Sequence, residues 1–173
     1  FCDACRRYKY IGLCYGSPGV GKSESAKHYA KWPLIEEYDF TNVAKPEVVS
    51  CRTVYHIASV ISNPKKLFSS IRHGRITLSW AVEDSLGLCE PFIDETSGMP
   101  DFRSDHPDVT ELIIVDEADR MKTLDLEQLR DMYDRNSTGV ILIGMPGLEK
   151  KISRYPQLYS RVGFVHHFRP LSN

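Results

Sequence analysis

A glycine-rich stretch near the start of the chain carries the residue types that bind phosphate. In order, it contains Gly16, Ser17, Pro18, Gly19, Val20, Gly21, Lys22 and Ser23, which fits the pattern G-x-x-x-x-G-K-[ST]. Glycines allow such a loop to curl until successive backbone N–H groups point at phosphate oxygens, and a helix that begins there adds its positive N-terminal end. Lys22 would reach the β- and γ-phosphates, and the Ser23 hydroxyl would hold Mg²⁺. We therefore expect residues 16–24, up to and including Glu24, to bind ATP.

An acidic pair supplies the second half of that chemistry. Four apolar residues, Leu112–Val115, lead directly into Asp116 and Glu117. A carboxylate that leaves the end of a neighbouring parallel strand lies beside the phosphates, at the edge where open α/β sheets bind ligands. Asp116 is expected to reach Mg²⁺, usually through water, and Glu117 to orient and deprotonate the attacking water. An ordinary acidic loop after a strand is the weaker interpretation once the glycine-rich loop is taken into account.

Hydrolysis also needs positive charge at the γ-phosphate, which P-loop enzymes often supply as an arginine finger from the same or a neighbouring subunit. Arg154 and Arg161 are the two candidates in the C-terminal part of the chain. Arg161 comes just before the last expected strand, near the sheet edge, so we prefer it for the catalytic role beside Lys22 and Glu117. A structural or solvated arginine is an equally good interpretation of either residue.

The elements that position these residues alternate between strands and helices. Strands are expected at residues 10–15, 53–58, 112–115, 140–143 and 163–168, and helices at residues 23–31, at 65–72 and after 123. Asn63 and Pro64 suit the cap and the first residue of the second helix, and Thr123 suits the cap of the third. Apolar strands that alternate with helices predict a parallel sheet covered on both faces, an α/β fold. The length of 173 residues predicts one domain over residues 1–173.

Composition argues against a strongly basic nucleic-acid binder, a membrane-spanning protein and a disulfide-bonded protein. The formal net charge is −1, so no global basic field indicates a nucleic-acid binder, although a local basic stripe remains compatible. No apolar run is long enough to span a membrane. The five cysteines are scattered and odd in number, which fits a reducing cytoplasm better than a disulfide framework. Acidic residues gather in residues 83–108, and from about Asp94 we expect an exposed loop.

Residues Asp116-Glu117-Ala118-Asp119 also spell the box of a helicase family. Such helicases carry two sheet domains and a Ser-Ala-Thr-like motif after the next strand. Here the strand after the box leads into residues 144–147, Gly-Met-Pro-Gly, and the chain is too short for two domains. A DEAD-type helicase is therefore a minor alternative.

Together, the motifs at 16–23, 112–117 and 155–161 resemble those of the AAA+ ATPases, and more narrowly the TniB/MuB group of transposition ATP-binding proteins. The resemblance implies a P-loop NTPase three-layer sandwich with about five strands in the order 5-1-4-3-2. It implies ATP-dependent rings or helical filaments of this chain, binding to target DNA and contact with a transposase. Arg161 matches the arginine finger that acts across the subunit interface, so a lone monomer is expected to hydrolyse ATP poorly.

The sequence departs from the pattern of the AAA+ ATPases in two features, the sensor residue and the C-terminal lid. Those proteins usually place a polar sensor residue at the end of the fourth strand, where this chain has Gly144 and Met145. Their C-terminal helical lid, with its second sensor arginine, would lie beyond Asn173, so we expect the sequence to be a piece of a longer chain. The first departure puts water positioning, and hence the turnover rate, in question.

The resemblance places DNA contacts in the region after the second strand. Lys65, Lys66, Arg72 and Arg75 are four basic residues within eleven, which suits tracking of a phosphate backbone without sequence preference. A solvated helix face is at least as good an interpretation of the same residues. The leading hypothesis is an ATP-dependent, DNA-bound regulator of transposition. The alternative is a nucleotide-switched adaptor that works through protein partners with little hydrolysis.

Overall fold

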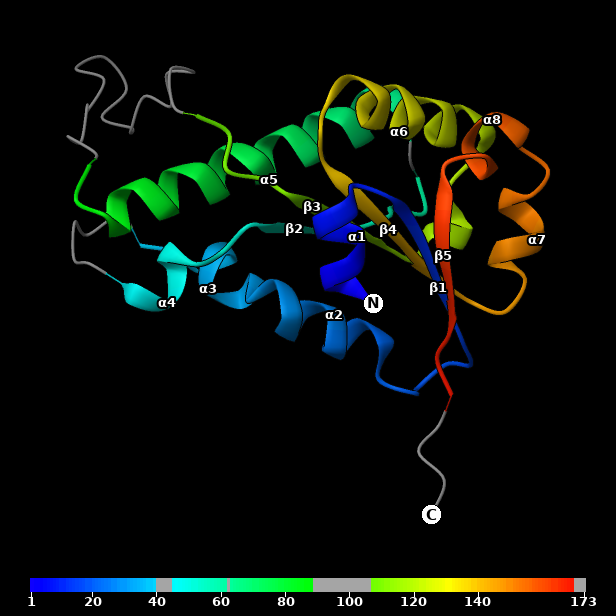
Figure 1. Ribbon diagram of the computed structural model, residues 1–173, viewed down its shortest axis with the longest axis horizontal. Coiled ribbons are helices and arrows are strands. Elements are labelled where there is room, and N and C mark those ends of the chain that lie inside the picture. Colours follow the sequence, from blue (N-terminus) through cyan, green and yellow to red (C-terminus); the bar gives the residue numbers. More distant parts are fainter. Residues whose placement is uncertain (40–44, 62, 89–106, 170–173) are drawn as a thin grey trace.

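The computed structural model describes residues 1–39, 45–61, 63–88 and 107–169. These residues contain a five-stranded sheet in which every neighbouring pair of strands is parallel (Figure 1). The strands are β1 (Ile11–Tyr15), β2 (Thr53–Ile57), β3 (Leu112–Asp116), β4 (Gly139–Gly144) and β5 (Val162–His167). Their order across the sheet is β2-β3-β4-β1-β5, which is the predicted order 5-1-4-3-2 read from the other edge.

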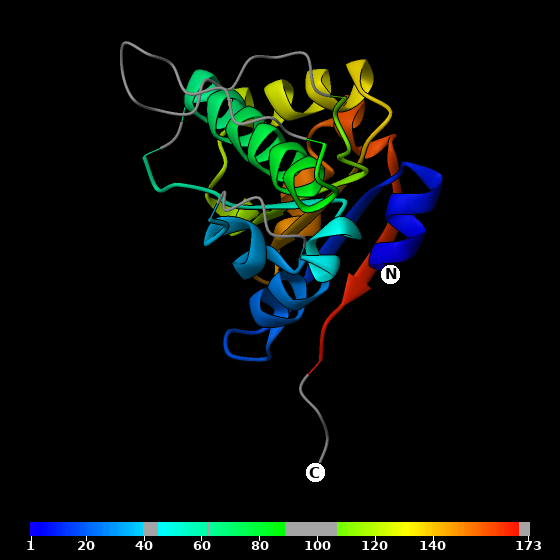
Figure 2. The ribbon, with the colours of Figure 1, turned by 90° about the vertical axis from the view of Figure 1, so that its left-hand side faces the viewer.

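Alternate residues of each strand face opposite sides of the sheet, and helices cover both sides. Ile113 and Val115 belong to one apolar cluster, whereas Leu112 and Ile114 belong to the other. The first cluster also takes residues from α5 (Pro64–Ser85), α6 (Thr123–Arg135) and α7 (Leu148–Ile152), and the second from α1 (Cys2–Tyr8) and α2 (Lys22–Ala30). Figure 2 shows α5 and α6 on one side of the sheet and α2 on the other. Because both faces are covered, the central strands β1, β3 and β4 are buried almost throughout, whereas the edge strand β5 is largely exposed.

Parallel pairing brings the carboxyl ends of the three central strands to one edge of the sheet. In the register of the structure, Tyr15 at the end of β1 pairs with Gly144 at the end of β4, and Ile57 at the end of β2 pairs with Asp116 at the end of β3. The glycine-rich loop follows β1 and the acidic pair ends β3, so the two predicted motifs emerge at the same edge. Open α/β sheets bind their ligands at this edge.

The predicted helices are present, with shifted ends. α5 begins at Pro64, and Asn63 caps it, because Asn63 Oδ1 accepts a hydrogen bond of 2.8 Å from the backbone N–H of Lys66. Thr123 is the first residue of α6 and not its cap; Lys122 precedes the helix, and its N–H donates to the Asp125 carboxylate at 2.9 Å. A side chain three residues into the helix thus replaces the hydroxyl cap expected from Thr123.

Several short helices were not expected from the sequence. They are α1, α3 (Trp32–Glu36), α4 (Pro46–Val49), α7, α8 (Pro156–Tyr159) and the 3₁₀ turn η1 (Ala118–Arg120). α2 ends at Ala30 with Lys31 as its left-handed cap, and Pro33 lies in the first turn of α3, where a missing N–H costs nothing. Most of the acidic loop expected from about Asp94 lies outside the described residues. Among the residues that the structure does describe, no helix is long and apolar enough to cross a membrane.

Candidate nucleotide-binding site

The glycine-rich loop runs from the end of β1 into α2. Gly16 donates its backbone N–H to the carbonyl of Gly144 at 3.4 Å, which ties the start of the loop to β4. Gly19 and Gly21 have φ angles of +74° and +91°, in the left-handed region that side chains rarely adopt. No atom lies within 4 Å of where a β-carbon would stand at either residue. Glycine is therefore required here by backbone conformation, and the space beside the loop is open for a ligand.

Lys22 is the first residue of α2 and folds back over the loop. Its Nζ donates to the carbonyl oxygens of Gly16 at 2.8 Å and Ser17 at 2.7 Å. A triphosphate is a stronger partner for an ammonium than two neutral carbonyls, because its oxygens carry negative charge that attracts the ammonium directly. Lys22 is thus held at the phosphate loop and can exchange these carbonyls for phosphate oxygens. Glu24 lies exposed in the first turn of α2, 3.7 Å from the Lys27 ammonium.

Asp116 ends β3 with its carboxylate almost completely buried, at 3 % exposure. Its Oδ1 accepts a hydrogen bond of 2.8 Å from the backbone N–H of Glu117, and its Oδ2 accepts one of 2.5 Å from the Tyr55 hydroxyl. Both oxygens are therefore held in place by donors from two different elements. An ionised carboxylate that is buried and oriented in this way suits a divalent cation, for which oxygen ligands are preferred.

Tyr55 is a site residue that sequence reasoning missed. It lies on β2 with 4 % exposure, and burial raises the pKa of its hydroxyl far above the ordinary range, as does the hydrogen bond to Asp116. The nearby Ser23 side chain acts in the opposite direction and lowers the pKa of Tyr55. The Tyr55 hydroxyl therefore binds Asp116, from β3, and lies beside Ser23, from the phosphate loop. The two residues predicted to hold Mg²⁺ are neighbours, and they fit the ion.

Glu117 adopts an uncommon backbone conformation, with φ of 55° and ψ of 34°. Lys9 and Lys31 share this left-handed conformation, but each ends a helix, where it is an ordinary cap. Glu117 follows a strand instead, and a residue other than glycine pays about 1–2 kcal/mol for such a backbone. Strain of this kind gathers at functional sites. The Glu117 side chain is half-buried and lies 3.5 Å from the Arg120 guanidinium.

The carboxylate of Asp119, which belongs to the neighbouring turn η1, lies at the end of β4. A β-carbon at Gly144 would lie 2.6 Å from Asp119 Oδ1, and that oxygen accepts a hydrogen bond of 3.1 Å from the Met145 N–H. Asp119 comes from η1, directly after the acidic pair. The polar side chain missing from the end of β4 thus has a counterpart that arrives from the neighbouring loop. Glycine at position 144 makes room for it.

Arg161 lies away from this edge. It immediately precedes β5, and its carbonyl accepts a hydrogen bond from the N–H of Ile11, at the amino end of β1. Its guanidinium forms a two-pronged ion pair with Asp134, with Nε–Oδ1 at 2.6 Å and Nη2–Oδ2 at 2.9 Å. Arg161 therefore stands at the opposite end of β1 from the phosphate loop of its own chain. Arg154 is exposed between α7 and α8.

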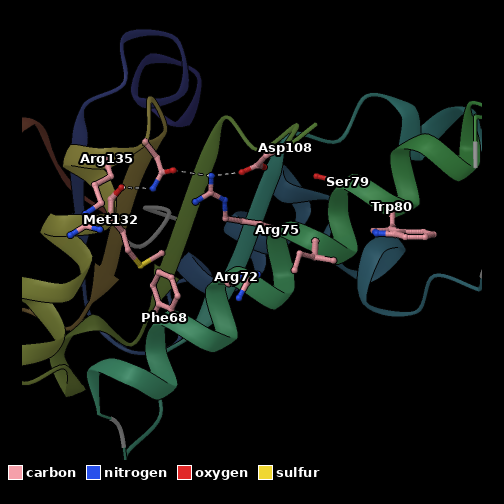
Figure 3. A pocket seen from close by; sticks show the side chains of 10 residues that line it. Phe68, Arg72, Arg75, Ser79, Trp80, Asp108, Met132 and Arg135 are labelled. Atoms are coloured by element: carbon pink, nitrogen blue, oxygen red, sulfur yellow. Dashed lines mark hydrogen bonds and ion pairs between the residues drawn. The ribbon is translucent and has the colours of Figure 1, made fainter. Parts of the chain in front are cut away.

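The four residues predicted to contact DNA divide into two groups. Lys65, Lys66 and Arg72 are exposed on the first part of α5. Arg75 is half-buried, pairs with Asp108 and donates to Asn136 at 3.4 Å, along the wall of a cavity of about 410 Å³ between α5 and α6 (Figure 3). The guanidinium of Arg75 is therefore engaged within the protein, whereas the other three cations face solvent.

A family model, a relative and a solved structure show what this chain is similar to. The family model of AAA domains matches residues 5–152. A potential ATP-binding protein of Staphylococcus aureus is 39 % identical over 181 residues, an alignment that covers 99 % of this chain and 64 % of that protein. This chain thus spans a little under two thirds of that relative's length. Among solved structures, the Pyrococcus furiosus Hef helicase domain has a sequence 16 % identical to that of this chain. The match has a TM-score of 0.43 and covers 99 % of this chain and 36 % of the Hef chain. With its phosphate loop, its acidic pair and its parallel five-stranded sheet, the chain belongs to the AAA domain family and is an ATP-binding P-loop domain of the AAA type.

Proposed function

We propose that this chain is a Mg²⁺-dependent ATPase that assembles with copies of itself on DNA and, together with a transposase, regulates transposition in the cytoplasm. The observation that carries the ATPase part is the meeting of two motifs about ninety residues apart in the sequence. The Tyr55 hydroxyl donates to Asp116 of β3 and lies beside Ser23 of the phosphate loop. A triphosphate bound by the loop would lie beside Ser23 and Asp116, the two expected ligands of its Mg²⁺ ion.

The residues of the site divide the work of hydrolysis. Backbone N–H groups of residues 16–23 bind phosphate oxygens, and Lys22 neutralises charge on the β- and γ-phosphates. Ser23 and Asp116 would hold Mg²⁺, which supplies positive charge to the transferring phosphoryl group when bound. Glu117 accepts the proton of the attacking water and orients that water. Asp119, at the end of β4, is the polar group nearest to the position of the usual sensor residue.

DNA binding and the transposase partner rest on different support. The resemblance to the TniB/MuB group suggests both, and the exposed cations Lys65, Lys66 and Arg72 on α5 suit contacts with a phosphate backbone. Arg75 contributes little to that surface while it is paired with Asp108. A surface of three exposed cations on one helix suits binding without sequence preference, since phosphate contacts carry no sequence information.

Replacement of Lys65, Lys66 and Arg72 by alanine is expected to weaken ATP-dependent binding to duplex DNA. Each lost phosphate contact lowers the slope of log K against log salt by about 0.9, so the triple change lowers it by roughly 3. Fluorescence anisotropy with a labelled duplex, across a salt series with and without ATP, measures this slope. A triple alanine variant at Arg7, Lys122 and Lys150 removes the same charge from exposed positions elsewhere. An equal loss in both variants would show a general charge effect and no DNA site on α5.

Mixing Arg161→Ala with Glu117→Gln subunits is expected to restore part of the ATPase activity that each variant lacks alone. In a mixed assembly, the intact Glu117 of one subunit meets the intact Arg161 of its neighbour, while the Arg161–Asp134 pair opens to allow this contact. Steady-state turnover in an assembled oligomer measures the rescue. The same mixture prepared with Arg154→Ala distinguishes the two arginines. Absence of rescue from the Arg161 mixture in an oligomer of normal size would assign Arg161 to its pair with Asp134.

The adaptor hypothesis predicts a different result from the same proteins. An adaptor binds ATP tightly, turns it over negligibly even when assembled, and gains affinity for a protein partner. Turnover that rises on duplex DNA supports the ATPase, because assembly on DNA would bring the arginine of one subunit to the nucleotide of the next. Turnover that stays negligible on DNA while ATP still binds would favour the adaptor.

A further inference from the structure

The side chain of Tyr55 is placed as a support for the metal site. Its ring is buried in the apolar cluster that also contains Ala26 and Ala30 of α2, the helix that begins in the phosphate loop. The Lys27 ammonium lies 5.9 Å from the centre of the ring. β2 and α2 together therefore hold the ring, and the hydroxyl at its tip reaches Asp116 Oδ2 at 2.5 Å.

We propose that Tyr55 is a positioning residue for the magnesium ion: its hydroxyl fixes the Asp116 carboxylate in the orientation that the hydrated ion requires. This proposal deepens the function proposed above and rests on it. Tyr55 does not bind the metal or the nucleotide. It acts through Asp116, as residues beyond the ligands of a metal site commonly do.

The hydrogen bonds of Asp116 show why the hydroxyl matters. Oδ1 is held by the N–H of Glu117, a donor that the backbone supplies whatever the side chains are. Oδ2 is held by Tyr55 alone among the hydrogen bonds that the structure shows for its described residues. Without the hydroxyl, a buried carboxylate oxygen loses its donor, and the Glu117 N–H at Oδ1 is left as the one hydrogen bond shown among the described residues that orients the carboxylate. The Mg²⁺ site would then have to order Asp116 at the moment of binding.

The hydroxyl also links the two halves of the site. The Ser23 side chain, which would bind the ion directly, lies beside the same hydroxyl. A phenol has one proton to donate and the carboxylate is its strongest acceptor, so Tyr55 can keep its bond to Asp116 when Ser23 binds the ion. The hydroxyl therefore supports Asp116 both before and after the ion binds.

Tyr55→Phe tests the proposal without relying on turnover. The affinity for a fluorescent ATP analogue is measured by anisotropy in Mg²⁺ and in EDTA, and the ratio of the two dissociation constants is the magnesium gain. Loss of a group that supports a metal ligand typically costs about 10- to 100-fold in metal affinity. We expect the magnesium gain of Tyr55→Phe to fall by roughly that factor, with the affinity in EDTA and the melting temperature without nucleotide nearly unchanged.

Tyr38→Phe is the matched control. Tyr38 is also a buried tyrosine whose hydroxyl donates to an aspartate, Asp84 Oδ2, at 2.7 Å, but it lies outside the phosphate site. Its loss is expected to leave the magnesium gain unchanged. The double variant Tyr55→Phe/Asp116→Asn is expected to lose no more of the gain than Asp116→Asn alone, because both changes act through one carboxylate.

The outcomes separate this proposal from the proposed function. A wild-type protein that binds the analogue equally well in Mg²⁺ and in EDTA would contradict the metal site itself. A normal magnesium gain in Tyr55→Phe, beside a clear gain in the wild type, would leave the ATPase proposal intact and remove the role of Tyr55. Collapse of the melting temperature in Tyr55→Phe would show that the hydroxyl serves folding, and would also overturn the proposal.

Discussion

Replacing Lys22 with alanine is expected to weaken ATP binding by roughly 10- to 100-fold. The ammonium is held at the loop by the carbonyls of Gly16 and Ser17, so it is already placed for a phosphate group. Hydrogen bonds to charged groups contribute about 1.5–3 kcal/mol, and the upper end corresponds to about two orders of magnitude in affinity. Isothermal titration calorimetry of ATP with Mg²⁺ measures the change directly.

The control for this experiment is Lys150→Ala, which removes an exposed lysine from α7. Its affinity for ATP is expected to match that of the wild type. The melting temperature of Lys22→Ala without nucleotide should be nearly unchanged, because the lysine forms only hydrogen bonds at a partly exposed surface. Unaltered ATP affinity in a folded Lys22→Ala protein would be incompatible with the assignment of residues 16–23 as the phosphate site.

Glu117→Gln is expected to lower the rate of hydrolysis by about 10²- to 10⁴-fold, the range that general base catalysis contributes. Glutamine keeps the size and the backbone conformation of the residue but cannot accept a proton at neutral pH. ATP affinity should therefore stay within a few-fold of the wild type, and bound nucleotide should remain ATP. Chromatography of the nucleotide released from the protein after incubation measures this retention.

Glu127→Gln provides the comparison for the change at Glu117. Glu127 lies on α6 and pairs with Arg130 at 3.2 Å, so the variant removes one carboxylate charge outside the nucleotide edge. We expect normal turnover from it. If Glu117→Gln also hydrolysed ATP at the wild-type rate under conditions where the wild type is assembled, the proton acceptor would have to be another group. Asp119, whose carboxylate lies at the end of β4, would be the first to test.

Much of the fold could be predicted from local patterns because its central strands are buried on both faces. Continuous apolar runs such as Leu112–Val115 predict strands of a parallel sheet, and every expected strand is present within one or two residues of its predicted ends. The short helices were harder. α1 begins with residues that look like an ordinary chain end, yet Cys5 packs completely buried against the sheet. The residues of such a segment carry no pattern that predicts a helix packed against the face of a sheet.

In the candidate site, too, some residues could be predicted from local sequence patterns and others could not. The loop at 16–23 and the pair at 116–117 follow from residue type and spacing, since phosphate cradles require glycine at left-handed positions and cations require carboxylates. Arg161 shows the limit of that approach. Its place before a strand was evident, but its pair with Asp134, on a helix 27 residues earlier in the chain, depends on how β5 and α6 pack.

An ATP-binding loop, an acidic pair and a parallel α/β sheet could all be inferred from the residues alone. These features are encoded locally, because each depends on residues next to one another in the chain. The side chains that support the loop and the acidic pair became visible in the folded chain. Tyr55 reaches Asp116 because β2 pairs beside β3, and Asp119 fills the space left by Gly144 because the loop after β3 packs against the end of β4. Contacts between segments distant in the chain follow from strand order and register, which no short stretch of residues specifies.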